Sequence, residues 1–112
     1  MTMSMRTLIA FAALAAIAAG NVAAADIEAG KKKVQEVCAA CHGIDGAAPI
    51  MPEYPKLSGQ YPDYLAKALR DYKSGARKNP IMAGFAAPLT DKDIENVAAY
   101  FSTQPSVLAT RY

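Results

Sequence analysis

Cysteine, histidine and tryptophan are scarce in this chain of 112 residues, which holds two cysteines, one histidine and no tryptophan. A structural zinc site needs four ligands, and these residues could complete one only with help from carboxylates. An excess of one charge is also missing. Apart from Arg6 near the start, eleven basic side chains face ten acidic ones. We therefore expect no nucleic-acid partner.

The sequence also lacks an apolar run long enough to cross a membrane. Its main run extends from Leu8 to Ala19, which is 12 residues, whereas a transmembrane helix needs about 20. Arg6 precedes the run, and the small residues 23–25 follow it. A positive start, a short apolar stretch and an A-x-A end are typical of a secretory signal peptide. We predict cleavage after Ala25, export to the periplasm and a mature domain of residues 26–112 without a membrane span.

Three segments of the mature part have the apolar spacing of amphipathic helices. They cover about residues 27–40, 62–75 and 90–105. The third segment has the clearest start, because Thr90 can cap a helix and Asp93 can complete a capping box. We found no alternating pattern typical of a strand. The sequence therefore predicts an all-α fold with three to four helices.

Two segments rich in proline and glycine separate these helices, at residues 42–61 and 75–89. Their composition predicts loops. Loops of this length are uncommon in small domains unless another group organises them. We therefore expect a cofactor to supply part of the core.

The two cysteines and the histidine form one motif, Cys38-Ala39-Ala40-Cys41-His42. This C-x-x-C-H string is the attachment sequence of c-type haem. At the end of a helix its members share one face, so two thiols can form thioethers with one porphyrin edge while the imidazole binds iron. A zinc site, a thiol redox pair and a plain disulfide remain alternatives at this point.

Two methionines lie in the mature part, and either could supply a second axial ligand. Met51 is only nine residues past His42, whereas Met82 is 40 residues past it, in the second proline-rich loop. The longer distance lets an intervening helix wrap the haem and deliver the sulfur to the opposite face. We therefore predict that Met82 binds the iron and that Met51 fills the core.

The chain resembles class I c-type cytochromes, in particular the short bacterial single-haem kind and one half of the two-haem kind. The resemblance is carried by C-A-A-C-H-G at residues 38–43, P-E-Y-P-K-L-S-G-Q at 52–60, Y-L at 64–65, G-A-R at 75–77, M-A-G-F-A-A-P-L-T-D at 82–91 and D-I-E-N-V-A-A-Y-F at 93–101. It implies a cytochrome c fold wrapped around one covalent haem c. It further implies axial ligation by His42 and Met82, and a crossing of the first and last helices at Gly30 and Tyr100.

The resemblance also implies that a proline carbonyl accepts a hydrogen bond from the His42 ring, which would orient the imidazole. Pro52 fits this role best, with Pro49 as the reserve. The haem faces would be covered by large apolar residues. These are Val37, Leu57, Leu65, Leu69, Ile81, Phe85, Leu89, Val97 and Phe101.

The leading hypothesis is a single-electron carrier rather than an enzyme, because no second catalytic cluster accompanies the motif. The expected partners are redox proteins such as an oxidase, a reductase or a dehydrogenase, and the chain would be a monomer or bound to a catalytic subunit. Lysines 31–33, or Lys73 with Arg77 and Lys78, could steer an acidic partner. One alternative is a cytochrome subunit of a flavoprotein dehydrogenase, such as a sulfide-oxidising one. A haem enzyme or gas sensor with an open iron site is the other.

Overall fold

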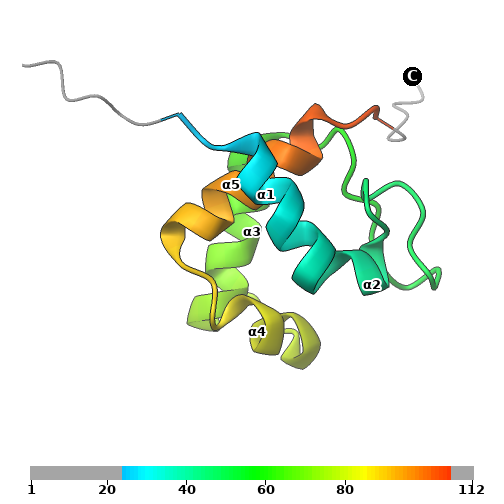
Figure 1. The fold of residues 1–112 in the computed structure, drawn as a ribbon. Coiled ribbons are helices and arrows are strands. Elements are labelled where there is room, and N and C mark those ends of the chain that lie inside the picture. Colours follow the sequence, from blue (N-terminus) through cyan, green and yellow to red (C-terminus); the bar gives the residue numbers. More distant parts are fainter. Residues whose placement is uncertain (1–23, 107–112) are drawn as a thin grey trace, which may run out of the picture.

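The computed structural model describes residues 24–106 and is helical throughout its regular parts (Figure 1). The elements are α1 Ile27–Lys33, the π-helix η1 Val34–Cys38, α2 Ala39–His42, α3 Pro62–Ser74, α4 Pro80–Ala86 and α5 Asp91–Thr103. No strand occurs among the described residues, which confirms the predicted all-α class. The predicted signal peptide, apart from its last two residues, lies outside the part that the structure describes.

The first predicted helix forms, but it is not a uniform α-helix. It begins after Asp26, whose side chain accepts a hydrogen bond from the Ala29 N–H, and α1, η1 and α2 then follow without a break as far as His42. Within η1 the hydrogen bonds join residues five apart: the Ala39 N–H donates to the Val34 carbonyl. Single π-turns of this kind are rare and occur often at functional sites. This one directly precedes the C-x-x-C-H motif.

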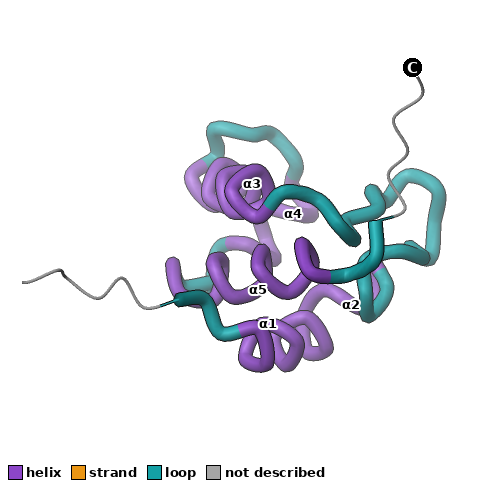
Figure 2. Tube along the Cα trace, turned by 90° about the horizontal axis from the view of Figure 1, so that it is seen from above, coloured by secondary structure: helices purple, strands orange, loops and turns teal. Residues whose placement is uncertain are grey.

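The crossing of α1 and α5 forms at Gly30, as the family resemblance implied. Figure 2 shows α5 lying between α1 and α3, in agreement with the helix contacts. A Cβ atom on Gly30 would lie 2.1 Å from the Asn96 carbonyl oxygen and 3.1 Å from the Tyr100 Cβ atom. Glycine is therefore the residue that permits this close approach.

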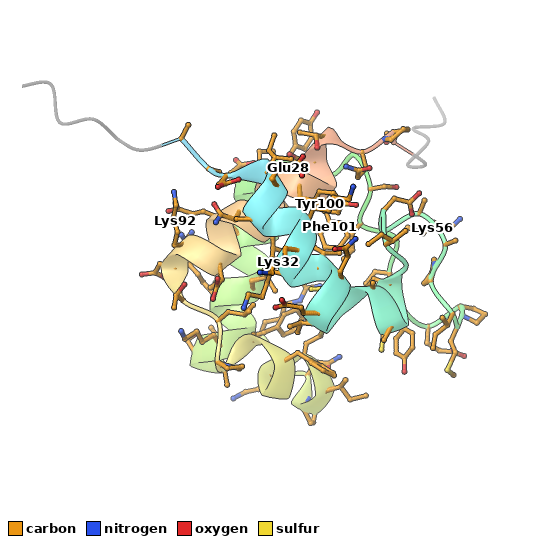
Figure 3. The ribbon with its side chains drawn as sticks, viewed as in Figure 1. Glu28, Lys32, Lys56, Lys92, Tyr100 and Phe101 are labelled. Carbon is orange, nitrogen blue, oxygen red and sulfur yellow. The ribbon has the colours of Figure 1, made fainter. Side chains whose placement is uncertain are left out.

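Two polar side chains of α5 reinforce the crossing. The buried Asn96 accepts a hydrogen bond of 2.8 Å from the Asp26 backbone N–H, and the Tyr100 hydroxyl donates one of 2.6 Å to the Ile44 carbonyl. Tyr100 is labelled beside α1 in Figure 3. The last helix thereby holds both the start of α1 and the loop that follows α2.

Helix α3 begins and ends where the sequence predicted. Pro62 occupies its first turn, where the missing N–H of proline costs nothing, and Gly75 ends it with a φ of +84°. Tyr61 makes no side-chain cap, as expected for this residue type. Leu65 and Ala66 are buried against α5.

The predicted loop at residues 75–89 is wrong in its middle part, because Pro80–Ala86 form the short helix α4. Proline and glycine are typical of loops, but Pro80 sits in the first helical turn, where proline is favourable. Asn79 caps the helix in front of it.

Helix α5 has the predicted capping box, with the Thr90 hydroxyl bonded to the Asp93 N–H and the Asp93 carboxylate bonded to the Thr90 N–H, each at 3.0 Å. The hydrogen bond from the Thr90 backbone lowers the pKa of Asp93 from its ordinary 3.8. A carboxylate with a lowered pKa stabilises the fold above its ordinary pKa, and this stabilisation disappears as the pH falls through the lowered value.

We therefore expect Asp93→Asn to be less stable than the parent at pH ~6 and the difference to shrink toward pH ~3. Thermal unfolding of both haem-loaded proteins, followed by circular dichroism across this range, measures the effect. A difference that stays constant with pH would show that the ionised form of Asp93 adds nothing to the cap.

None of the helices in residues 24–106 has both the length and the apolar character that a membrane crossing requires.

Candidate functional site

A cleft of about 250 Å³ opens between α3, α4, α5 and the C-x-x-C-H segment. All nine apolar residues that the sequence predicted as a haem cover line it. They come from η1, α3, α4, α5 and the loop segments that hold Leu57 and Leu89. These side chains give the cleft the apolar walls that a large planar cofactor needs.

Cys38, Cys41 and His42 all line this cleft. Cys38 closes η1, and the other two residues belong to the single turn of α2. Both thiols are free and half-buried. Among residues 24–106 there is no group of three or more His, Cys, Asp or Glu side chains that could hold a metal ion.

The environment of Cys38 does not suit a reactive thiol. Burial raises the pKa of this thiol to about 11, and the positive charge of Lys33 offsets only part of the rise. The thiolate is the form that attacks disulfides and binds zinc, so a thiol with a raised pKa is poorly suited to either task. A neutral sulfur in an apolar wall is compatible with a thioether.

The His42 ring is oriented by a backbone carbonyl, but not by the one that the sequence predicted. Its Nδ1 lies 2.9 Å from the carbonyl oxygen of Pro55, whereas Pro52 is exposed and does not line the cleft. A tight turn, in which the Tyr54 N–H bonds the Met51 carbonyl, carries Pro52 outward and brings the chain back at Pro55. The prediction of Pro52, with Pro49 in reserve, is therefore wrong.

This hydrogen bond defines the chemistry of the imidazole. A carbonyl can only accept, so Nδ1 carries the proton and Nε2 of the neutral ring keeps its lone pair for a metal. His42 is buried, and the Tyr54 ring lies 6.2 Å from it between centroids. The second nitrogen is thus held in the form in which histidine ligates iron.

The two methionines lie in different environments. Met82, in α4, is half-buried and lines the same cleft as His42. Met51 is 46% exposed and does not line the cleft, so the prediction that it fills the core is wrong. It occupies the outward turn described above, which its carbonyl closes by accepting the hydrogen bond from the Tyr54 N–H. Among residues 24–106, Met82 alone therefore places a thioether at the cleft.

Several polar residues of the cleft were not identified from the sequence. Tyr64 and Tyr72 line it from α3, and the Arg77 guanidinium lies 4.9 Å from the Tyr72 ring centroid. A hydrogen bond to Tyr64 raises the pKa of Arg77. The spacing of Tyr64, Ala68 and Tyr72 at i, i+4 and i+8 is a helical line that could have revealed this wall.

The predicted steering cations are partly engaged within the fold. Lys73 donates a hydrogen bond to the Leu89 carbonyl, and Lys33 pairs with Glu36 at 3.8 Å. Lys32 and Lys56, both labelled in Figure 3, are exposed. Of the predicted cations, Lys31, Lys32 and Lys78 are exposed and remain available for contact with a partner.

The donor set fits a haem attached through two thioethers. The cleft combines an apolar lining, two thiols that share a helix end, an imidazole with Nε2 free and one thioether sulfur. C-x-x-C-H is the attachment string of c-type haem, and histidine and methionine are axial ligands found in cytochromes c. The fold and the site define an all-helical haem protein of the c type.

The comparisons give the family. Residues 27–105 match the family model described as Cytochrome c. Cytochrome c4 of Stutzerimonas stutzeri is 50% identical over 91 residues, which are 73% of this chain and 42% of the relative. Cytochrome c-554(548) of Halomonas halodenitrificans is 42% identical over 84 residues, or 72% of this chain and 99% of the relative. The chain belongs to the cytochrome c family, whose members named here are electron-transfer proteins rather than enzymes, and it carries one covalent haem c.

A solved structure agrees with this assignment. The crystal structure of reduced recombinant cytochrome c4 from Pseudomonas stutzeri superimposes with a TM-score of 0.66 at 46% identity, over 73% of this chain and 47% of that one. A Stutzerimonas stutzeri protein named thiosulfate dehydrogenase electron acceptor is 38% identical over 79 residues, or 70% of this chain and 37% of that protein. The chain spans about two fifths of the length of the cytochromes c4 that it matches.

Proposed function

We propose that the protein is a periplasmic single-electron carrier. Its haem c is attached through Cys38 and Cys41, with His42 and Met82 as axial ligands. The observation that carries the proposal is the placement of His42 and Met82, on separate helices, in the lining of one apolar cleft. The bound haem supplies the Fe(II)/Fe(III) couple, and a His/Met pair raises its potential.

The residues around the cleft suit electron transfer better than catalysis. With His42 and Met82 both engaged, no coordination position remains for a substrate. The apolar walls exclude water, and the Pro55 carbonyl holds the imidazole in one orientation. Both oxidation states can then share one arrangement of ligands, which keeps the structural change on electron transfer small.

Export supports the same function. The charged start, short apolar run and Ala23-Ala24-Ala25 end of the sequence are those of a signal peptide, so we propose that cleavage after Ala25 releases the domain into the periplasm. Its partners there would be redox proteins, and its exposed lysines, such as Lys56, would contact acidic groups around their electron exit sites.

Spectroscopy and potentiometry of the purified protein test this proposal. We expect haem that resists acid extraction, a weak red sulfur-to-iron charge-transfer band in the oxidised state and a titration with one electron per chain. A colourless protein with both thiols free, after expression in a host that attaches haem c, would overturn it. Rapid uptake of carbon monoxide by the reduced protein at neutral pH would instead indicate an enzyme or a gas sensor.

A second candidate is a cytochrome c subunit bound to a flavoprotein dehydrogenase. One relative is named as the electron acceptor of a dehydrogenase, which supports a dehydrogenase as the electron donor. Size-exclusion chromatography of the native protein separates the two candidates. Co-elution of haem and flavin at equal amounts would favour the subunit, whereas a small haem-containing species alone favours the free carrier.

A further inference from the structure

Asn79 makes nearly every polar contact at the start of the helix that carries Met82. Its side-chain Oδ1 accepts hydrogen bonds from the N–H groups of Ile81 and Met82, both at 3.0 Å. Its backbone carbonyl accepts a third from the N–H of Ala83 at 2.9 Å. Met82 is therefore bonded, through its own backbone, to the residue in front of the helix.

The first turn of α4 depends on these bonds. The first N–H groups of a helix have no partner within it, and Pro80 removes one of them because proline has none. The remaining ones, on Ile81, Met82 and Ala83, all go to Asn79. Without the side chain of Asn79, two of the three lose their partners in one step.

Helix α4 is short, and it packs mainly against α3. It consists of seven residues, which is far below the length at which an isolated helix persists in water. Ala86 is the one buried residue of α4. The larger apolar side chains of this helix are partly exposed, Ile81 at 56% and Phe85 at 43%. A cap therefore contributes a larger share of the order of this helix than it does in α5, which has 13 residues.

We propose that Asn79 is a positioning residue for the axial sulfur: by capping α4 it holds the Met82 backbone where the thioether reaches the iron. This inference rests on the proposed ligation by Met82 and adds the residue that maintains it. Loss of the cap lets the first turn fray, and Met82 lies in that turn. The fraction of molecules with the sulfur detached then rises, although the chain stays folded.

An exogenous ligand measures this fraction directly. Imidazole added to the oxidised haem-loaded protein competes with Met82, and its apparent Kd is inversely proportional to the detached fraction. Removing a cap of this kind corresponds to about a fivefold change in the equilibrium. We expect Asn79→Ala to lower the apparent Kd for imidazole about fivefold and to weaken the red charge-transfer band.

Conservative variants distinguish the side-chain acceptor from simple bulk. Asn79→Asp and Asn79→Ser keep an oxygen that can cap, so their Kd for imidazole should stay within about twofold of the parent. If Asn79→Ala does not fold, Asn79→Gly replaces it, because glycine is tolerated at the cap and still removes Oδ1. The glycine variant should lower the Kd by about twofold.

Thr90→Ala provides the matched control. Thr90 caps α5 in the same way, through a hydroxyl bonded to the Asp93 N–H at 3.0 Å, but α5 carries no axial ligand. We expect this variant to lower the midpoint of thermal unfolding about as much as Asn79→Ala does while leaving the Kd for imidazole unchanged. Equal Kd values for the two alanine variants would overturn the role of Asn79.

The two levels of the proposal fail in different ways. If the parent lacks the red band, or if Met82→Ala binds imidazole no better than the parent, then Met82 is not the ligand and the proposed ligation fails. If both of those measurements come out as expected but Asn79→Ala behaves like Thr90→Ala, ligation stands and the positioning role alone is overturned.

Discussion

Replacing Met82 by alanine is expected to abolish the red charge-transfer band and to let the reduced protein bind carbon monoxide at neutral pH. The half-buried thioether at the cleft is the second axial ligand in our proposal, so its removal opens one coordination position. The potential should fall, because methionine ligation is what raises it. The variant should also lose about 2 kcal/mol of stability from the cavity it leaves.

Met51→Ala is the control for this experiment. Met51 is the other methionine beyond residue 25, and it is 46% exposed in a turn away from the cleft. Absorption spectra, carbon monoxide titrations and potentiometry should leave this variant indistinguishable from the parent. Loss of the band in Met51→Ala and its retention in Met82→Ala would reverse the assignment of the ligand.

Replacing Gly30 by alanine is expected to destabilise the fold more than any exposed substitution in α1. The new Cβ would lie 2.1 Å from the backbone oxygen of Asn96, and a backbone atom cannot rotate away as a side chain can. The helices α1 and α5 must separate, and a cost of about 3 kcal/mol is typical of such overpacking. The gain in helix propensity from glycine to alanine, about 1 kcal/mol, offsets only part of it.

Guanidinium unfolding of the haem-loaded protein, followed by circular dichroism and by haem absorbance, measures this loss. Lys32→Ala is the matched control, since it places the same new residue two positions away on the exposed side of α1 (Figure 3). Its stability should stay within about 0.5 kcal/mol of the parent. Equal stability of Gly30→Ala and Lys32→Ala would mean that the helices can move apart freely at the crossing.

Local chemistry was enough to predict several parts of the molecule. The spacing of Cys38, Cys41 and His42 specifies haem attachment, and the structure places all three in one cleft. Thr90 and Asp93 specify a helix start through contacts three residues apart. In each case the residues that decide the structure lie close together in the sequence, so their spacing carries the information.

Other parts depend on contacts that spacing does not encode. The partner of the His42 ring is Pro55, 13 residues further on, and the choice among the prolines of this loop follows from the turn at Met51 and Tyr54. Helix α4 was missed because Pro80 can either end a helix or begin one. Only the capping contact of Asn79 decides between these roles.

The π-turn between Val34 and Cys38 has a consequence for how the first helix can change. Five residues occupy a turn that would hold about four in an α-helix, so everything after it is rotated by about 100° relative to Gly30. The π-turn thus shifts the helical register by one residue between Gly30, which faces α5, and Cys38, where the haem-attachment motif begins. Deleting Gln35, which is exposed, would return this segment to α-helical register without removing a buried side chain. At this position chain length, rather than residue type, determines where the thiols point.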